Sequence, residues 1–278
     1  MEAAEMAMLM LCICCAGSLL YGRNSAVANL GLSWLARSAL MGAIVAGGTF
    51  IIIHSPFGRR SGAHFNPALT VAYFSLGRIH RWDAFGYVMA HFFGGIAGVF
   101  FAHQLLGANL SDFPVRYVIT LPGRNGSIIA FIAEFITSFV LMEVVLLATN
   151  HRRLARYTPL FVALVTVFYY MLSMSISGYS VNPARSFSSA LFAHVWQGIW
   201  IYFIAPGFGM LAAATLYRKV AGADRVYCAK VLHDFQSNCP FNCRVAELYD
   251  RAQPVNQWCP ETASPPASHS AHQRKDAT

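Results

Sequence analysis

Two short stretches decide the fold of this chain: SGAHFNPAL at residues 61–69 and YSVNPARS at residues 179–186. Both contain the tripeptide Asn-Pro-Ala. Asparagine is a strong N-cap and proline is favoured at the first helical position, so each tripeptide predicts the start of a helix. The apolar pieces that follow, residues 67–76 and 183–194, are too short to cross a bilayer as helices. Each stretch therefore predicts a half-helix.

Six longer apolar stretches accompany these two pieces. Of the 278 residues, 56% are apolar and 12% are charged, which is about half the charged share of a typical soluble domain. Only helices and closed barrels satisfy their backbones in lipid, and these stretches lack the alternation of barrel strands. The sequence therefore predicts an all-α membrane protein with six transmembrane helices, near residues 4–21, 35–54, 84–105, 128–148, 159–177 and 197–217.

The order of these pieces predicts an inverted repeat. Each half holds three spans and one half-helix, and an odd number of spans turns the second half upside down relative to the first. We expect a channel domain over residues 1–220, with repeats near 1–106 and 127–220, and a polar tail over residues 221–278. The Pro- and Ser-rich composition of the last part of the tail predicts disorder.

The basic residues predict the orientation of the chain. The net charge is +8, yet the arginines stand in short loops between apolar runs, which indicates membrane topology rather than nucleic-acid binding. By the positive-inside rule both termini are cytoplasmic, in the inner or plasma membrane of a cell. The residues that give this bias are Arg59, Arg60, Arg78, Arg81, Arg152, Arg153, Arg156, Arg218 and Lys219.

Two helix starts inside a membrane have a chemical consequence. The first N–H groups of a helix lack partners, and a bilayer tolerates such an end only where it faces protein or water. Half-helices that enter from opposite faces would meet near the centre. Each would bring a partial positive charge and an amide donor, from Asn66 or Asn182. Such a site passes neutral molecules and opposes cations and protons.

The two motifs resemble the signature loops of the major intrinsic protein family, the aquaporins and glycerol facilitators. The resemblance rests on Asn66-Pro67-Ala68 and Asn182-Pro183-Ala184 with their flanking residues, and it covers residues 4–218. It implies two re-entrant half-helices, a pore in each subunit of a homotetramer, a lipid environment and no cofactor.

The resemblance also implies a selectivity filter on the outer side of the motifs. Its arginine corresponds to Arg185, and counting back along the family pattern gives Tyr179 and Tyr170. Water-selective members usually carry a small residue and a histidine at these two positions, so the tyrosines are a departure that predicts a narrowed pore. Ungapped counting gives Ala46, in the second span, as the fourth filter position.

Further residues are expected to support the loops. By resemblance, Glu5 and Glu134 accept hydrogen bonds from the backbones of the re-entrant loops, and His64 supports the first loop. The alternative for Glu5 is an exposed acid near the N-terminus. We interpret His91 as a packing or loop contact, with a pH-sensing role as the alternative. Glu143 has no assigned role.

The permeant is predicted to be water, because the side chains at four positions resemble those of water channels: Ser186, Ala190, Tyr202 and Phe203. We expect a passive channel for water and other small uncharged solutes. Glycerol, ammonia and hydrogen peroxide are alternatives. A secondary transporter is another, since broken helices and inverted repeats also mark that class. An enzyme is disfavoured because no nucleophile–base pair has a recognisable spacing.

A second candidate site lies in the tail. Cys228, His233, Cys239 and Cys243 are soft ligands with the spacing C-x4-H-x5-C-x3-C. Zinc accepts such sets, although this spacing does not match a known zinc finger. The sequence leaves two interpretations: free thiols in a loose tail, or a resident metal.

Overall fold

The computed structural model describes residues 1–278 except 234, 236–238 and 250–278. In the described part, six helices are long and apolar enough to cross a membrane. They are α1 (Glu2–Tyr21), α2 (Trp34–His54), α5 (Arg81–Leu106), α7 (Gly126–Thr149), α8 (Thr158–Ser173) and α10 (Ile199–Ala221), and the span that contains α8 begins at Ala155 with the 3-10 turn before it. The six predicted spans are confirmed. Helix α8 ends at Ser173, before its predicted end at residue 177, and the chain then turns toward the second loop through Gly178, whose φ is +80°.

The two Asn-Pro-Ala tripeptides begin α4 (Pro67–Ser75) and α9 (Pro183–Ala193). Asn66 Oδ1 accepts a hydrogen bond from the Ala68 N–H at 2.9 Å, and Asn182 Oδ1 accepts one from the Ala184 N–H at 3.1 Å. Each asparagine is thus an N-cap that satisfies one of the orphan donors of its helix. The predicted half-helices are confirmed.

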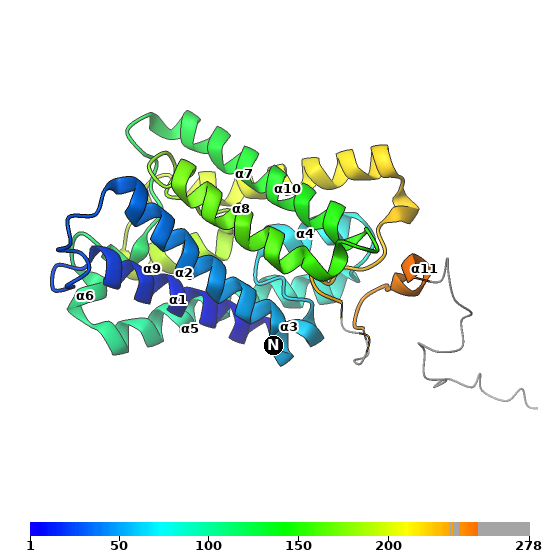
Figure 1. Ribbon diagram of the computed structural model, residues 1–278, viewed down its shortest axis with the longest axis horizontal. Helices are drawn as coiled ribbons and strands as arrows, with labels where there is room; N and C mark the ends of the chain where they lie inside the picture. Colours follow the sequence, from blue (N-terminus) through cyan, green and yellow to red (C-terminus); the bar gives the residue numbers. More distant parts are fainter. Residues whose placement is uncertain (234, 236–238, 250–278) are drawn as a thin grey trace, which may run out of the picture.

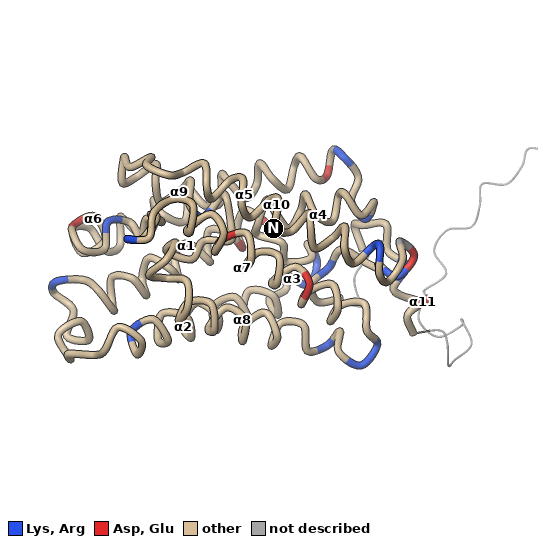
Figure 2. The backbone as a smooth tube through the Cα atoms, turned by 90° about the horizontal axis from the view of Figure 1, so that it is seen from above, with Lys and Arg blue, Asp and Glu red and all other residues tan. Residues whose placement is uncertain are grey.

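The half-helices lie within the bundle of long helices. In Figure 1 the long helices run across the view, with α4 and α9 between them toward opposite ends of the bundle, and Figure 2 agrees. The N-terminus lies toward the α4 end. The short helices are α3 (Pro56–Ser61) and α11 (Val245–Tyr249) at the α4 end, α6 (Ala108–Ser111) at the α9 end, and the 3-10 turns Arg116–Val118, Ala155–Tyr157 and Ala223–Arg225.

Close backbone approach holds the long helices together. Helix α1 packs on α5, and α7 packs on α10. A Cβ on Gly94 would lie 2.1 Å from the Ala3 carbonyl oxygen, and a Cβ on Gly209 would lie 2.5 Å from that of Phe135. Glycine is therefore required at both crossings, as is common where membrane helices associate through small residues.

The first part of the tail is packed on the channel. Residues 226–231 are all buried. The Val231 N–H donates to the Gly62 carbonyl at 3.0 Å, and the Asn242 N–H donates to the Arg78 carbonyl at 3.1 Å. We call residues 226–233 and 239–243 the strap. A loose tail is therefore the wrong interpretation for the strap, while the segment predicted to be disordered lies outside the described residues.

Candidate functional site

Asn66 and Asn182 lie where the N-termini of α4 and α9 meet. The Asn66 Nδ2 donates to the Val181 carbonyl at 2.8 Å, and the Asn182 Nδ2 donates to the Phe65 carbonyl at 2.8 Å. Each loop is thus fastened to the other. The Asn182 Nδ2 also lies 3.7 Å from Met6 Sδ, a weak acceptor. Because an amide has two N–H donors, each asparagine can also offer one to an oxygen atom in the cavity that both residues line.

A buried carboxylate holds the second loop. Glu134 of α7 accepts hydrogen bonds from the Ser180 N–H at 2.9 Å, the Val181 N–H at 2.7 Å and the Ser177 hydroxyl at 2.7 Å. Its side chain is completely buried. These bonds fix the Val181 carbonyl that accepts from Asn66, so Glu134 positions one half of the central contact.

Two carboxylates share the same task in the first loop. Glu2 accepts from the His64 N–H at 3.1 Å and the Phe65 N–H at 2.7 Å, while Glu5 accepts from the Ser61 hydroxyl at 2.6 Å. The prediction that Glu5 accepts from the loop backbone is therefore wrong. Glu5 stands almost one helical turn further along α1, and Glu2 is the residue that reaches the amides. Sequence reasoning missed Glu2.

Two tyrosines from the neighbouring long helices complete the support. The Tyr87 hydroxyl of α5 donates to the Ser61 carbonyl at 2.7 Å, and the Tyr202 hydroxyl of α10 donates to the Ser177 carbonyl at 2.6 Å. The two halves therefore repeat the contact as well as the motif. The pairing could have been suspected from the repeat, since one tyrosine stands in the third span of each half.

Both loops use backbone conformations that are unfavourable for residues with a side chain. φ is +58° at Ala63 and +30° at Phe65, and it is +46° at Tyr179 and +49° at Val181. Left-handed conformations at such residues cost on the order of 1–3 kcal/mol each and persist only where the surroundings impose them. The carboxylate bonds to the loop N–H groups supply that constraint.

Two histidines lie at the α4 end of the site. The His64 ring nitrogens lie 2.9 Å from Thr70 Oγ1 and 2.7 Å from the Ala229 carbonyl oxygen. His91 Nε2 lies 2.8 Å from a carboxylate oxygen of Glu2. His64 therefore connects α4 to the strap, and His91 contacts the carboxylate that holds the first loop.

The asparagines and the predicted filter share one cavity. Its volume is about 100 Å³, and residues of both halves line it. No carboxylate is found among the described residues that line it. Its lining includes Asn66, Asn182, Arg185, Tyr170, Tyr179 and Val231.

Arg185, Tyr170 and Tyr179 lie together at one part of this cavity. The two tyrosine rings meet nearly edge to face, with 4.7 Å between their centroids. Arg185 is only 3% exposed, and its Nη1 has no hydrogen-bond partner among the described residues. The ion pairs found among the described residues do not involve Arg185, so its Nη1 can donate to the contents of the cavity.

The fourth predicted filter residue does not line the cavity. Val45 and Thr49, one turn apart on α2, face it, while Ala46 is buried elsewhere. The prediction that Ala46 lines the filter is therefore wrong; a shift of a single position turns a helical side chain by about 100°. Gly42 faces Tyr170 instead: a Cβ there would lie 2.9 Å from Tyr170 Cβ. The lack of a side chain at Gly42 lets the tyrosine pack closely against α2.

Six apolar helices, two half-helices and a cavity at their meeting point define a multi-pass membrane protein of the pore-forming class. The model of the major intrinsic protein family matches residues 3–217. The chain belongs to this family.

Known relatives agree with this assignment, and a solved structure shares the fold. The chain is 35% identical over 167 residues to a probable NIP-type aquaporin of Nicotiana alata, which covers 59% of this chain and 60% of that protein. It is 33% identical over 179 residues to the glycerol uptake facilitator protein-like 6 of Lactiplantibacillus plantarum. That alignment covers 60% of this chain and 79% of the other protein. Its fold is similar to that of the aquaglyceroporin from Plasmodium falciparum, with a TM-score of 0.63, 18% identity, and coverage of 81% and 96%.

Proposed function

We propose that this chain is a passive channel for water and other small uncharged solutes that excludes ions and protons. The observation that carries the proposal is the reciprocal contact in which Asn66 and Asn182 each donate to the opposite loop at 2.8 Å. This contact holds the two half-helix N-termini together beside the cavity that both asparagines line. A water oxygen that accepts from both amides there cannot take part freely in a continuous proton-conducting file.

The charges around the cavity support the exclusion of cations. Two helix N-termini each contribute a partial positive charge, and Arg185 adds a full one. No carboxylate lines the described part of the cavity to offset them. The lack of a lining carboxylate also argues against a secondary transporter, because coupling to protons or sodium usually needs an acid near the middle of the membrane.

The constriction favours water over glycerol. Tyr170 and Tyr179 place two large rings beside Arg185, and their hydroxyls can donate and accept while the rings form an apolar wall. Ser186 is buried and its hydroxyl lies 2.7 Å from Thr120 Oγ1, so this water-type residue shapes the loop rather than the lumen. The names of the relatives include both aquaporins and a glycerol facilitator, which keeps glycerol as the permeant to test against.

The distribution of charge supports a cytoplasmic location for both termini. Figure 2 shows Lys and Arg gathered at the ends of the long helices, with most of them toward the end where α3 and α11 lie. The N-terminus and the strap lie toward the same end. By the positive-inside rule this end faces the cytoplasm. A homotetramer with one pore per subunit is the assembly we propose from the family resemblance.

The test is stopped-flow permeability of proteoliposomes. We expect water flux well above the lipid background, linear in the osmotic gradient, with slower glycerol flux and no proton leak. In Tyr179→Thr the ratio of glycerol flux to water flux should rise. Glycerol faster than water in the unmodified protein would contradict the water assignment, and saturable, ion-dependent uptake would replace the channel with a transporter.

A further inference from the structure

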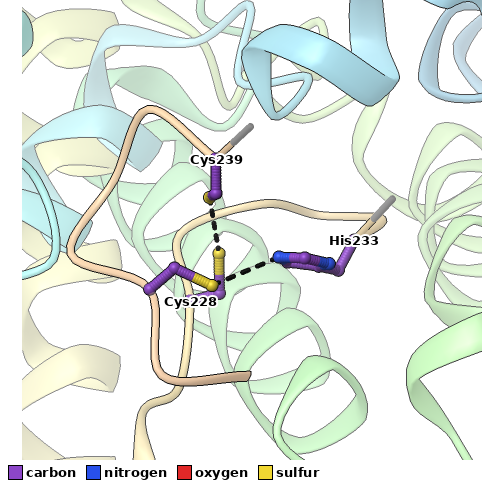
Figure 3. A group of neighbouring side chains, drawn as sticks. Cys228, His233 and Cys239 are labelled. Atoms are coloured by element: carbon purple, nitrogen blue, oxygen red, sulfur yellow. Dashed lines mark hydrogen bonds between the residues drawn. The ribbon is translucent and has the colours of Figure 1, made fainter. Parts of the chain in front are cut away.

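The four soft ligands of the tail converge in space. One ligand atom from each of Cys228, His233, Cys239 and Cys243 can be chosen so that all four lie within 4.8 Å of one another. Figure 3 shows Cys228, His233 and Cys239 pointing toward one another from the two segments of the strap. The cluster lies away from the asparagines and the filter, and the proposed channel function makes no use of it.

The distances fit a tetrahedral metal better than a disulfide. The sulfur atoms of Cys228 and Cys239 lie 3.5 Å apart, and His233 Nε2 lies 3.2 Å from Cys243 Sγ. A disulfide would need about 2.0 Å between sulfurs. A tetrahedron with zinc–sulfur bonds of 2.3 Å has edges of about 3.8 Å, and zinc–nitrogen bonds shorten the mixed edges to about 3.5 Å. The observed pairs are therefore already near the edges of a zinc site.

We propose that Cys228, His233, Cys239 and Cys243 bind one Zn²⁺ ion. Three thiolates and one imidazole form a closed four-ligand set, which is the composition of structural rather than catalytic zinc sites. The strap lies at the end of the bundle proposed above to be cytoplasmic. Thiols stay reduced in that compartment, so metal binding is favoured there over disulfide formation.

A zinc ion at this site would join the two segments of the strap, each of which contacts the channel near α4. In the first segment, the Ala229 carbonyl oxygen lies 2.7 Å from His64 Nε2, and the Val231 N–H donates to Gly62. In the second, the Phe241 ring stacks on His64 with centroids 5.4 Å apart and planes at 7°, while Asn242 Nδ2 donates to the carbonyl of Gly77 at 3.0 Å. Cross-linking the segments through one ion fixes both sets of contacts at once.

The exposure of the Lys230 amine gives an independent measure of whether zinc holds the strap in place. The Lys230 side chain is 1% exposed, and Nζ donates to the Arg59 carbonyl at 2.6 Å. Its neighbour Val231 lines the pore cavity. If zinc holds the strap in place, the Lys230 amine is shielded while the metal is bound and becomes exposed when the strap is released.

The first experiment measures metal content in the full-length protein purified in detergent without chelators. We expect about one zinc per chain in the unmodified protein and in the control Cys15→Ser, whose thiol lies in α1, and almost none in Cys228→Ser/Cys239→Ser. Protein stripped by a chelator and reloaded with Co²⁺ should show the visible bands of a tetrahedral thiolate site. Less than about a tenth of a metal ion per chain, even after reloading, overturns the proposal.

The second experiment uses the unmodified protein, so it does not depend on a variant that folds. An amine-reactive reagent followed by mass spectrometry should label Lys230 several-fold more after chelation, and added Zn²⁺ should reverse the increase. Equal labelling with and without zinc, or a Cys228–Cys239 disulfide found by non-reducing peptide mapping, overturns the proposal that bound zinc holds the strap in place. Neither experiment measures flux, so a failure here is separate from a failure of the proposed channel function.

Discussion

The support of the two loops predicts that equivalent substitutions have unequal effects. In Glu134→Ala, the carboxylate that accepts from Ser177, Ser180 and Val181 is lost. In Glu5→Ala, only the Ser61 hydroxyl loses its acceptor, because the amides of the first loop bond to a different carboxylate. The first substitution should therefore be much more damaging than the second.

The magnitude follows from the number of buried donors that are left without a partner. Each costs about 1–3 kcal/mol. The Ser177 hydroxyl also lies 3.4 Å from the Ser173 carbonyl oxygen and can turn to that acceptor, which leaves two stranded N–H groups in Glu134→Ala. We expect a loss of about 2–6 kcal/mol in the free energy of unfolding for Glu134→Ala and about 1–3 kcal/mol for Glu5→Ala.

The assay is denaturant-induced unfolding in detergent micelles, followed through the fluorescence of the five tryptophans, together with water flux in proteoliposomes. Glu134→Ala should also lose most of its flux, because the Val181 carbonyl that accepts from Asn66 is released. Glu134→Gln is the matched control. Since it keeps one acceptor oxygen, its stability and its flux should fall between those of the unmodified protein and those of Glu134→Ala. Equal losses in Glu134→Ala and Glu5→Ala would refute this account of how the loops are held.

Three further predictions concern the pore and the helix packing beside it. Asn182→Leu removes a donor and fills the centre of the cavity, so vesicle water flux should fall to the lipid background while the protein still inserts. Tyr170→His shortens one wall of the constriction, so stopped-flow water flux should rise, and an unchanged flux would remove that ring from the filter. Gly42→Ala places a Cβ 2.9 Å from Tyr170 Cβ, and unfolding in detergent should show a loss of about 1–3 kcal/mol from overpacking.

The sequence predicts the fold and the centre of the site because both depend on strong local signals. Asn-Pro sets an N-cap and a first helical residue at once, and few other arrangements use that pair inside an apolar chain. The six spans follow from length and hydropathy. Arg185 stands three residues into a helix whose start Asn182 fixes, so its placement beside the cavity carries little uncertainty in register.

Residues on the long helices were harder to place, because their register relative to the loops is set by tertiary packing. A shift of one residue turns a helical side chain by about 100°, which is enough to exchange Ala46 for Val45. A shift of three residues keeps nearly the same helix face, so Glu2 and Glu5 are equivalent in pattern and differ only in height along α1. Local sequence carries no information about which height the first loop reaches.

The packing of the strap could not be deduced from the sequence because its apolar residues at 226–232 are too few to indicate which part of the channel they cover. The structure links this segment to the pore by a short series of contacts. The Ala229 carbonyl oxygen lies 2.7 Å from His64, the other ring nitrogen lies 2.9 Å from the Thr70 hydroxyl, and that hydroxyl lies 3.3 Å from the Asn66 carbonyl oxygen. Glu134 gives the second loop an internal support, whereas the first loop also depends on a segment beyond the channel helices. The two halves of the repeat thus place matching asparagines at the cavity, but the loops that carry them are held by different kinds of contact. Within the described residues, this series of contacts leads from the strap to Asn66, while Tyr227 of the strap also donates to Asn150 at the end of α7 at 2.8 Å.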